Sequence, residues 1–274
     1  MSLNLMYITN NVEVALVAEK FGVERIFVDM EYIGKSDRQG NMDTVQNAHT
    51  VEDVCKLRKV LTKSELLVRV NPIHNATENY TSSEEEINAV IDAGADIIML
   101  PFFKTVEEVE TFLKIVDDRC RTMLLVETPE SVEVIDDIIN LKGIDEMFIG
   151  LNDLSLGYGK HFMFELLADG TVEKLSLKFK LKGLPFGFGG IAAIGKGTLP
   201  SEYVIKEHYR LGSHCAILSR SFCNTNIITD PVEIENIFKT GLKEIRDLEK
   251  QCESHISYFN DNNTQMKKIV NAVS

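Results

Sequence analysis

The sequence has few of the features that mark fibrous, disulfide-rich or membrane proteins. Its 17 glycines and six prolines are too few, among 274 residues, for collagen or a low-complexity linker. The five cysteines are odd in number and form no Cys-x-x-Cys pair, so neither a disulfide framework nor a thiolate zinc site is indicated. No 18-residue apolar run and no export-signal pattern is present, so we expect a cytoplasmic protein without a membrane span.

Positive charge is also scarce, since 29 lysines and arginines face 42 acidic residues and the net charge is −13. The electrostatic field of a protein with this negative charge repels phosphate backbones and anionic membrane surfaces. We therefore expect neither a nucleic-acid nor a membrane partner. An anionic substrate would need a local positive centre, either a metal ion or a buried arginine.

What the chain does contain is eight short apolar runs that alternate with segments of helical period, the pattern of repeated βα units. The predicted strands are 3–9, 25–30, 66–70, 96–101, 122–127, 146–150, 184–188 and 214–218. The predicted helices are 12–21, 51–61, 83–93, 106–116, 131–141, 162–179, 201–211 and 232–253. The residues Thr50, Ser82 and Thr105 are typical helix caps.

Eight successive βα units close most economically into a (β/α)8 TIM barrel, an α/β fold predicted here as one domain over residues 1–253. A doubly wound open sheet is the alternative. Residues 254–274 lose the helical period, and we expect a C-terminal extension that is loosely ordered or lies at a subunit interface.

A barrel brings the carboxyl ends of all its strands to one face, where catalytic residues of this fold are found. Four predicted strand ends carry polar residues that an apolar strand does not need. These residues are Asp29 and Glu31, Arg69, Glu127, and Asn152 with Asp153. We therefore expect several carboxylates and one guanidinium at the barrel mouth.

Glu127 and Asp153 are the candidate metal ligands. Carboxylates on neighbouring strand ends, without cysteine or paired histidine nearby, suit a hard divalent cation such as Mg²⁺. Each could instead be a loop-capping carboxylate, and Asp153 could cap a short helical turn that begins at Leu154.

Arg69 lies within an apolar strand, where its charge is costly unless it is paired or faces the mouth. Its planar guanidinium suits a carboxylate ligand. The alternative is a structural ion pair with Asp29 or Glu31 on the adjacent strand, and that pair is compatible with substrate binding.

These segments resemble the HpcH/HpaI aldolase and citrate lyase beta-chain family, metal-dependent (β/α)8 barrels of the phosphoenolpyruvate/pyruvate superfamily. The resemblance spans residues 25–223. It is carried by 27–31 (Phe-Val-Asp-Met-Glu), 68–72 (Val-Arg-Val-Asn-Pro), 93–101, 126–128 (Val-Glu-Thr) and 148–155 (Phe-Ile-Gly-Leu-Asn-Asp-Leu-Ser). The last segment is the most specific.

The resemblance implies a role for each polar strand end. Glu127 and Asp153 would bind Mg²⁺ or Mn²⁺, and Arg69 would steer a 2-oxo acid. Backbone amides around Asn152 and Asp153 would hold the substrate carboxylate. Asp29 and Glu31 would order water or the metal shell.

The implied reaction is cleavage or formation of a carbon–carbon bond next to a 2-oxo acid or an acyl thioester. It would pass through a metal-stabilised enolate. The expected partners are a small carboxylic acid, such as pyruvate, or an acyl-CoA, and further copies of the chain in a homo-oligomer.

Tyr32 departs from the family pattern, because aldolases of this family have a histidine there for acid/base work. Tyr32 is therefore a catalytic candidate beside Arg69, Asp29 and Glu31, although its reference pKa near 10 makes it a poor base. Metal-bound water, His49 or His74 are possible substitutes. The alternative function is a catalytically altered or inactive barrel that binds metal and small carboxylates as a sensor or complex subunit.

Overall fold

The computed structural model describes residues 2–34, 49–254 and 256–274 of the chain. Its eight parallel strands form a closed barrel in chain order, which confirms the (β/α)8 fold. Because β8 pairs with β1, from Asn4 opposite Cys215 to Tyr7 opposite Leu218, the open-sheet alternative is excluded. The strands are β1 (Asn4–Ile8), β2 (Arg25–Asp29), β3 (Glu65–Arg69), β4 (Ile97–Leu100), β5 (Arg121–Val126), β6 (Glu146–Ile149), β7 (Phe186–Ile191) and β8 (Cys215–Leu218).

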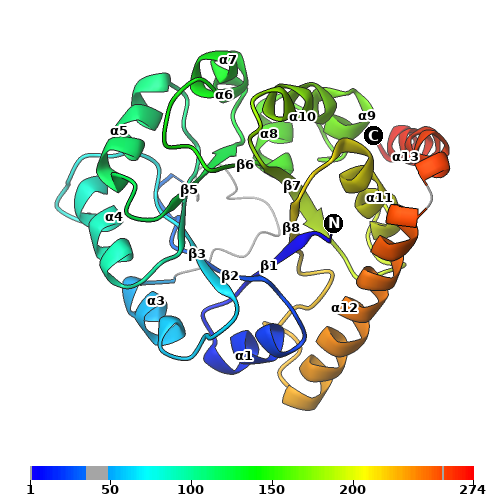
Figure 1. The fold of residues 1–274 in the computed structure, drawn as a ribbon, viewed down its shortest axis with the longest axis horizontal. Helices are drawn as coiled ribbons and strands as arrows, with labels where there is room; N and C mark the ends of the chain where they lie inside the picture. Colours follow the sequence, from blue (N-terminus) through cyan, green and yellow to red (C-terminus); the bar gives the residue numbers. More distant parts are fainter. Residues whose placement is uncertain (1, 35–48, 255) are drawn as a thin grey trace.

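Helices surround the barrel as a ring (Figure 1). They are α1 (Val12–Lys20), α3 (Val51–Arg58), α4 (Ser83–Asp92), α5 (Val106–Val116), α6 (Pro129–Glu133), α7 (Ile135–Ile138), α8 (Leu151–Gly157), α9 (Glu165–Ala168), α10 (Thr171–Leu181), α11 (Ser201–Leu211), α12 (Pro231–Ser254) and α13 (Phe259–Val273), with a 3-10 turn at Ile256–Tyr258. Among the described helices, none has the length and hydropathy required to cross a bilayer.

Local signals in the sequence explain several helix boundaries. Ser82 and Thr105 cap α4 and α5 through capping boxes, as predicted. The predicted helix 162–179 is instead divided into α9 and α10, because Gly170 adopts a left-handed conformation (φ 85°) that interrupts it. The predicted helix 131–141 is likewise divided, into α6 and α7, at the non-helical Val134.

The short helix α8 was not predicted, and it matters for the site. It begins directly after β6 with Gly150 as its N-cap, so Asn152 and Asp153 lie in its first turn. Asp153 is therefore not the cap of a turn beginning at Leu154. Helix α8 thus begins three residues before the turn that the sequence suggested.

Side chains at alternate positions of the strands point inward and fill the interior of the barrel. This inner cluster consists of Met6, Phe27, Leu67, Ile97, Met99, Met123, Leu125, Phe148 and Cys215. A larger apolar cluster lies between strands and helices. Along β2 the inward positions are Arg25, Phe27 and Asp29, so one strand places charges at both ends of the barrel and an aromatic ring between them.

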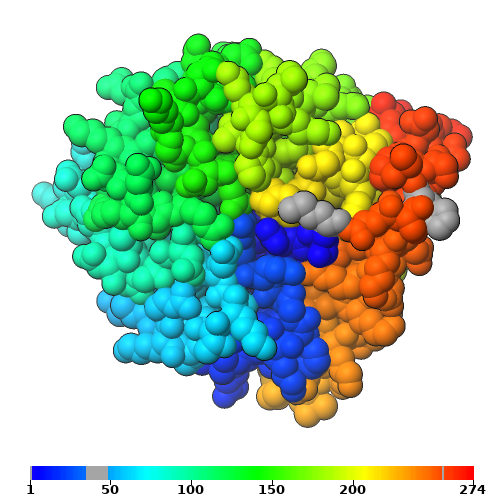
Figure 2. Space-filling model, viewed as in Figure 1, coloured from blue at the N-terminus to red at the C-terminus, as the bar shows by residue number. Residues whose placement is uncertain are grey.

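The end of the barrel at which the strands begin has no open cavity in the space-filling view. Figure 2 shows the face that carries the N-terminal segment leading into β1, in blue near its centre, bordered by cyan, green and yellow segments. The carboxyl ends of the strands, which carry the predicted site residues, therefore lie on the far side of this view.

The C-terminal segment differs from the expectation of loose order. Helix α13 packs against α11 and α9, and its Met266 and Val270 are buried. Asn262 is buried as well and donates to Glu207 Oε1 at 2.9 Å, so one of the polar residues that obscured the helical period is itself a contact. A position of this segment at a subunit interface stays a prediction.

Candidate active site

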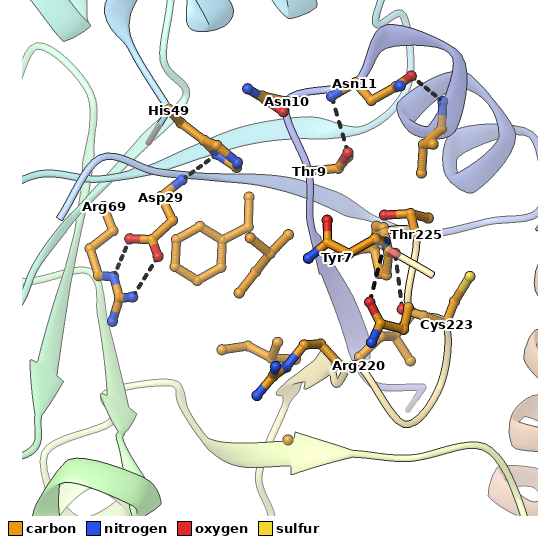
Figure 3. Close-up of a pocket in the computed structure, with 18 of the residues that line it drawn as sticks. Tyr7, Thr9, Asn10, Asn11, Asp29, His49, Arg69, Arg220, Cys223 and Thr225 are labelled. Carbon is orange, nitrogen blue, oxygen red and sulfur yellow. Dashed lines mark hydrogen bonds and ion pairs between the residues drawn. The ribbon is translucent and has the colours of Figure 1, made fainter. Parts of the chain in front are cut away.

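A cavity of about 610 Å³ opens at the carboxyl ends of the strands. Five of the predicted site residues line it: Asp29, Arg69, Glu127, Asn152 and Asp153. Figure 3 shows Asp29 and Arg69 on one side of this cavity, with residues of β1 and of the segment after β8 on the other. The fold therefore brings together the five predicted residues, which lie between positions 29 and 153 of the sequence.

Arg69 and Asp29 form a bidentate ion pair. They occupy paired register positions at the ends of β3 and β2, and both face inward. Arg69 Nε and Nη2 donate to the two Asp29 oxygens at 2.8 and 2.9 Å, and Nη1 lies 3.2 Å from Glu31 Oε2. Burial opposes the charge on Arg69, but Asp29, Glu31 and Glu127 together hold its pKa well above the usual value. Arg69 therefore forms the structural ion pair that was the alternative interpretation, and it also lines the cavity.

Glu31 and Tyr32 do not line the cavity. Glu31 is fully buried beneath Arg69. The backbone N–H of Tyr32 donates to Asn71 Oδ1 at 3.0 Å, and its ring lies against Tyr80 with centroids 5.3 Å apart. Tyr32 is 47% exposed. Partial burial, with Glu86 and Tyr80 nearby, raises the pKa of Tyr32, so still less of this side chain is deprotonated and able to accept a proton near neutral pH.

Glu127 is held in place by its surroundings. It follows β5 directly and is buried, and its Oε1 accepts the backbone N–H of Phe102 at 3.0 Å. Gly150 leaves room for it, because a Cβ atom at that position would lie 2.8 Å from Glu127 Cβ and 2.9 Å from Oε2. The glycine at the start of α8 is therefore required for the carboxylate to lie here.

Asp153 lies beside the same cavity on α8. It is in the first helical turn, where the partial positive charge of the helix end favours a carboxylate. Asn152 Nδ2 lies 3.4 Å from Asp153 Oδ1. The donor set of Glu127 and Asp153 contains only carboxylate oxygens, and it therefore fits a hard divalent cation that completes its coordination with water and substrate.

A second group of possible metal ligands, Glu146, His214 and Cys215, lies at the opposite end of the barrel. Glu146 already accepts two hydrogen bonds from Arg25 at 2.7 Å each, and His214 uses both ring nitrogens, on Glu146 and on the Phe186 carbonyl. A guanidinium in the same group disfavours a cation, so we interpret this cluster as structural.

His49 is a cavity residue that the sequence left unplaced. It is buried, and its Nδ1 accepts the backbone N–H of Asp29 at 3.0 Å (Figure 3). The neutral ring then carries its proton on Nε2. His74 instead hydrogen-bonds Pro72 and Thr81 carbonyls in its own loop. Only the fold distinguishes these two loop histidines, because neither has a local sequence signal.

Comparisons with known proteins bear on the family and the fold of the chain. A model of the HpcH/HpaI aldolase/citrate lyase family matches residues 10–165. No curated protein matches the chain. The fold is similar to an HpcH/HpaI aldolase from Desulfitobacterium hafniense DCB-2 (17% identity, TM-score 0.60, covering 80% of this chain and 86% of that one).

Two further solved structures have the same fold. They are the citrate synthase SbnG (17% identity, TM-score 0.57, covering 80% and 85%) and a citrate lyase from Burkholderia xenovorans LB400 (12% identity, TM-score 0.57, covering 87% and 78%). Since the family model covers more than half of the sequence, the chain belongs to the HpcH/HpaI aldolase/citrate lyase family.

Proposed function

We propose that the protein is a divalent-metal-dependent carbon–carbon lyase, of aldolase or citrate-lyase-like type, that acts on a 2-oxo acid such as pyruvate. The observation that carries this proposal is that Glu127 and Asp153 line one cavity together with Arg69. Membership of a family of aldolases and lyases supports it. An acyl-CoA substrate and assembly into a homo-oligomer stay predictions.

Glu127 and Asp153 would hold Mg²⁺ or Mn²⁺. Bound there, the ion would supply Lewis-acid stabilisation, worth several kcal/mol, of the negative charge that develops on oxygen when the carbon–carbon bond breaks. Asp29 and Glu31 position the guanidinium of Arg69 at the cavity wall, so that no reorganisation is needed when it meets the oxo acid.

His49 would hold the end of β2 in position rather than serve as a general base. Its Nδ1 accepts the Asp29 N–H, so a proton cannot be accepted there without breaking that bond. This contact fixes the backbone of Asp29, the residue that in turn binds Arg69.

The position of Tyr32 favours a second candidate function. The residue that stands where family aldolases have histidine lies outside the cavity lining. A barrel that binds metal and small carboxylates without turnover, as a sensor or complex subunit, is the alternative. It predicts retained binding of pyruvate or oxalate with no chemistry.

Exchange of the pyruvate methyl protons in D₂O, followed by NMR, separates the two functions. The lyase requires removal of one such proton, so we expect exchange at least about tenfold above that of free metal and buffer. Chelator should abolish it, and added Mg²⁺ or Mn²⁺ should restore it. Pyruvate binding without exchange under both metals would support the alternative and contradict the lyase.

A further inference from the structure

The turn between β4 and α5 contains a residue in an unusual backbone conformation. Phe102 has a φ of 51°, in the left-handed region that bulky side chains rarely adopt. Among the described residues, the other non-glycine residues with positive φ are Asp117 and Asp118, at the end of α5. A short polar side chain such as aspartate tolerates this region, so it is Phe102 whose conformation needs a reason.

Both neighbours of Phe102 are fixed. The ring of Pro101 locks its own φ, and Phe103 is buried in the core, where its carbonyl accepts the Oγ1–H of Thr128 at 2.8 Å. The ring of Phe102 is only partly buried, and Lys104 Nζ lies 5.5 Å from its centroid. The chain therefore turns at Phe102, and burial of this ring does not explain the left-handed conformation.

The conformation serves a hydrogen bond to Glu127. The backbone N–H of Phe102 donates to Glu127 Oε1 at 3.0 Å, while Phe103 still turns inward to the core. Glu127 Oε2 lies towards Gly150, because a Cβ atom at that glycine would be 2.9 Å from it. Gly150 caps α8, and Asp153 lies in the first turn of the same helix. One carboxylate oxygen is thus held by the β4 turn, and the other faces the helix that carries the second proposed ligand.

The backbone next to Glu127 is held by the same turn. Thr128 donates to the Phe103 carbonyl and also caps α6, where its Oγ1 accepts the Ser131 N–H at 3.0 Å. Two hydrogen bonds therefore join residues 102–103 to residues 127–128, one to the carboxylate and one to the residue after it. A carboxylate that is fixed in advance loses little conformational freedom when a cation binds, and such hydrogen-bonded support raises metal affinity.

We propose that Phe102 is a positioning residue for Glu127, an inference that rests on the proposed function. Its left-handed backbone presents the N–H that holds Oε1, so that Oε2 is directed towards α8 before a cation arrives. Phe102 is not among the residues that line the cavity, and it therefore acts through Glu127. The unfavourable φ of Phe102 is the cost of this orientation.

The test measures the Mn²⁺ affinity of the full chain by EPR of the unbound ion, a readout that does not depend on turnover. Phe102→Gly and Phe102→Val both remove the ring, but glycine adopts a positive φ freely, whereas a β-branched residue disfavours it. We expect the Mn²⁺ Kd of Phe102→Gly to stay within about threefold of that of the unsubstituted chain, and that of Phe102→Val to be at least about tenfold higher. Equal Kd values in the two variants would overturn the positioning role.

The same two substitutions at Asp117 are the matched control. Asp117 is also left-handed, with a φ of 48°, but it ends α5 and is not among the residues that line the cavity. Asp117→Val should be less stable than Asp117→Gly, whereas the Mn²⁺ Kd of both should stay within about twofold of that of the unsubstituted chain. A loss of affinity in Asp117→Val as large as that in Phe102→Val would assign the effect to general destabilisation and contradict the proposal.

A backbone ester isolates the hydrogen bond itself. Phenyllactic acid in place of Phe102 retains the ring but replaces the N–H by an oxygen, so Mn²⁺ should bind at least about tenfold more weakly. Unchanged affinity of the ester, with Mn²⁺ binding lost in Glu127→Gln, contradicts the positioning role alone. If the unsubstituted chain binds no Mn²⁺, or Glu127→Gln binds it equally well, the proposed metal site is refuted, and the proposed function with it.

Discussion

The two ends of the barrel both contain buried charges but differ in how these are balanced. The closed end is the end of the barrel at which the strands begin. There Arg25 and Arg121 form ion pairs with Glu65 and Glu146, and His214 donates to Glu146 as well. At the mouth, Arg69 stands among four carboxylates, of which two, Asp29 and Glu31, are bound to it. The other two, Glu127 and Asp153, line the cavity.

We interpret the charges of the closed end as structural, and we propose that those of the mouth are functional. Each group at the closed end is matched by a partner of opposite sign, so the cluster satisfies itself and needs no ligand. At the mouth, Glu127 and Asp153 line a cavity that a dication could enter. Phe27 and Leu67 of the inner apolar cluster separate the two ends along β2 and β3.

The largest expected effect is on activity, at the mouth. Glu127→Gln keeps the shape of the side chain but removes the charge of one metal ligand, and we expect kcat/KM to fall at least about 10³-fold, or roughly 4 kcal/mol. Steady-state kinetics at saturating Mg²⁺ would measure this. The matched control is Glu130→Gln on α6, an exposed partner of Lys104 outside the cavity lining, which should stay within about twofold. Equal losses in both variants would refute the metal assignment.

The next effect is on stability, at the closed end. Arg25 is 2% exposed and donates to Glu146 and Glu65, so Arg25→Met leaves a buried carboxylate short of its main partner. We expect a loss of about 3–5 kcal/mol in the free energy of unfolding. Denaturant titration would measure it, and activity per folded molecule should be unchanged.

Two further variants sharpen that measurement. Replacing both partners, in Arg25→Met/Glu146→Leu, should recover much of the loss, because no buried charge remains unpaired. Arg58→Met breaks a partly exposed pair with Asp96 and should cost less than about 1 kcal/mol. If Arg25→Met were as mild as Arg58→Met, the closed end would not be the tightly paired cluster that we describe.

The fold was readable from the sequence because its signals are local. Every predicted strand exists, and the boundaries differ by at most three residues. The period of apolar residues marks strands buried on both faces, and residues such as Ser82 mark helix starts. Helix α13 was not predicted because the burial of Asn262, Met266 and Val270 depends on contacts with other helices, among them α11, and not on a local pattern.

The site was readable only in part, for a physical reason. Asp29, Arg69 and Glu127 stand out because a charge at a strand end is conspicuous, and the barrel then fixes where strand ends meet. His49 lies on a loop, whose course depends on contacts between distant segments. The position of Tyr32 outside the cavity lining has the same origin, since the Asn71 side chain, 39 residues away, binds the backbone there.

The smallest effect is a pH dependence of stability. Burial acts against ionisation of Glu146, but hydrogen bonds from His214 and Arg25 lower its pKa from 4.5 to about 2. A carboxyl whose pKa is depressed by folding contributes stability above its unfolded value, and that contribution is lost as pH falls from about 4.5 towards 2. The loss is at most about 3 kcal/mol. The unfolding free energies of the protein and of Glu146→Gln should therefore converge as the pH falls from about 4.5 towards 2, because only the unsubstituted chain loses the stabilisation by the Glu146 carboxylate. Parallel curves would show that Glu146 does not carry the acid sensitivity of the closed end.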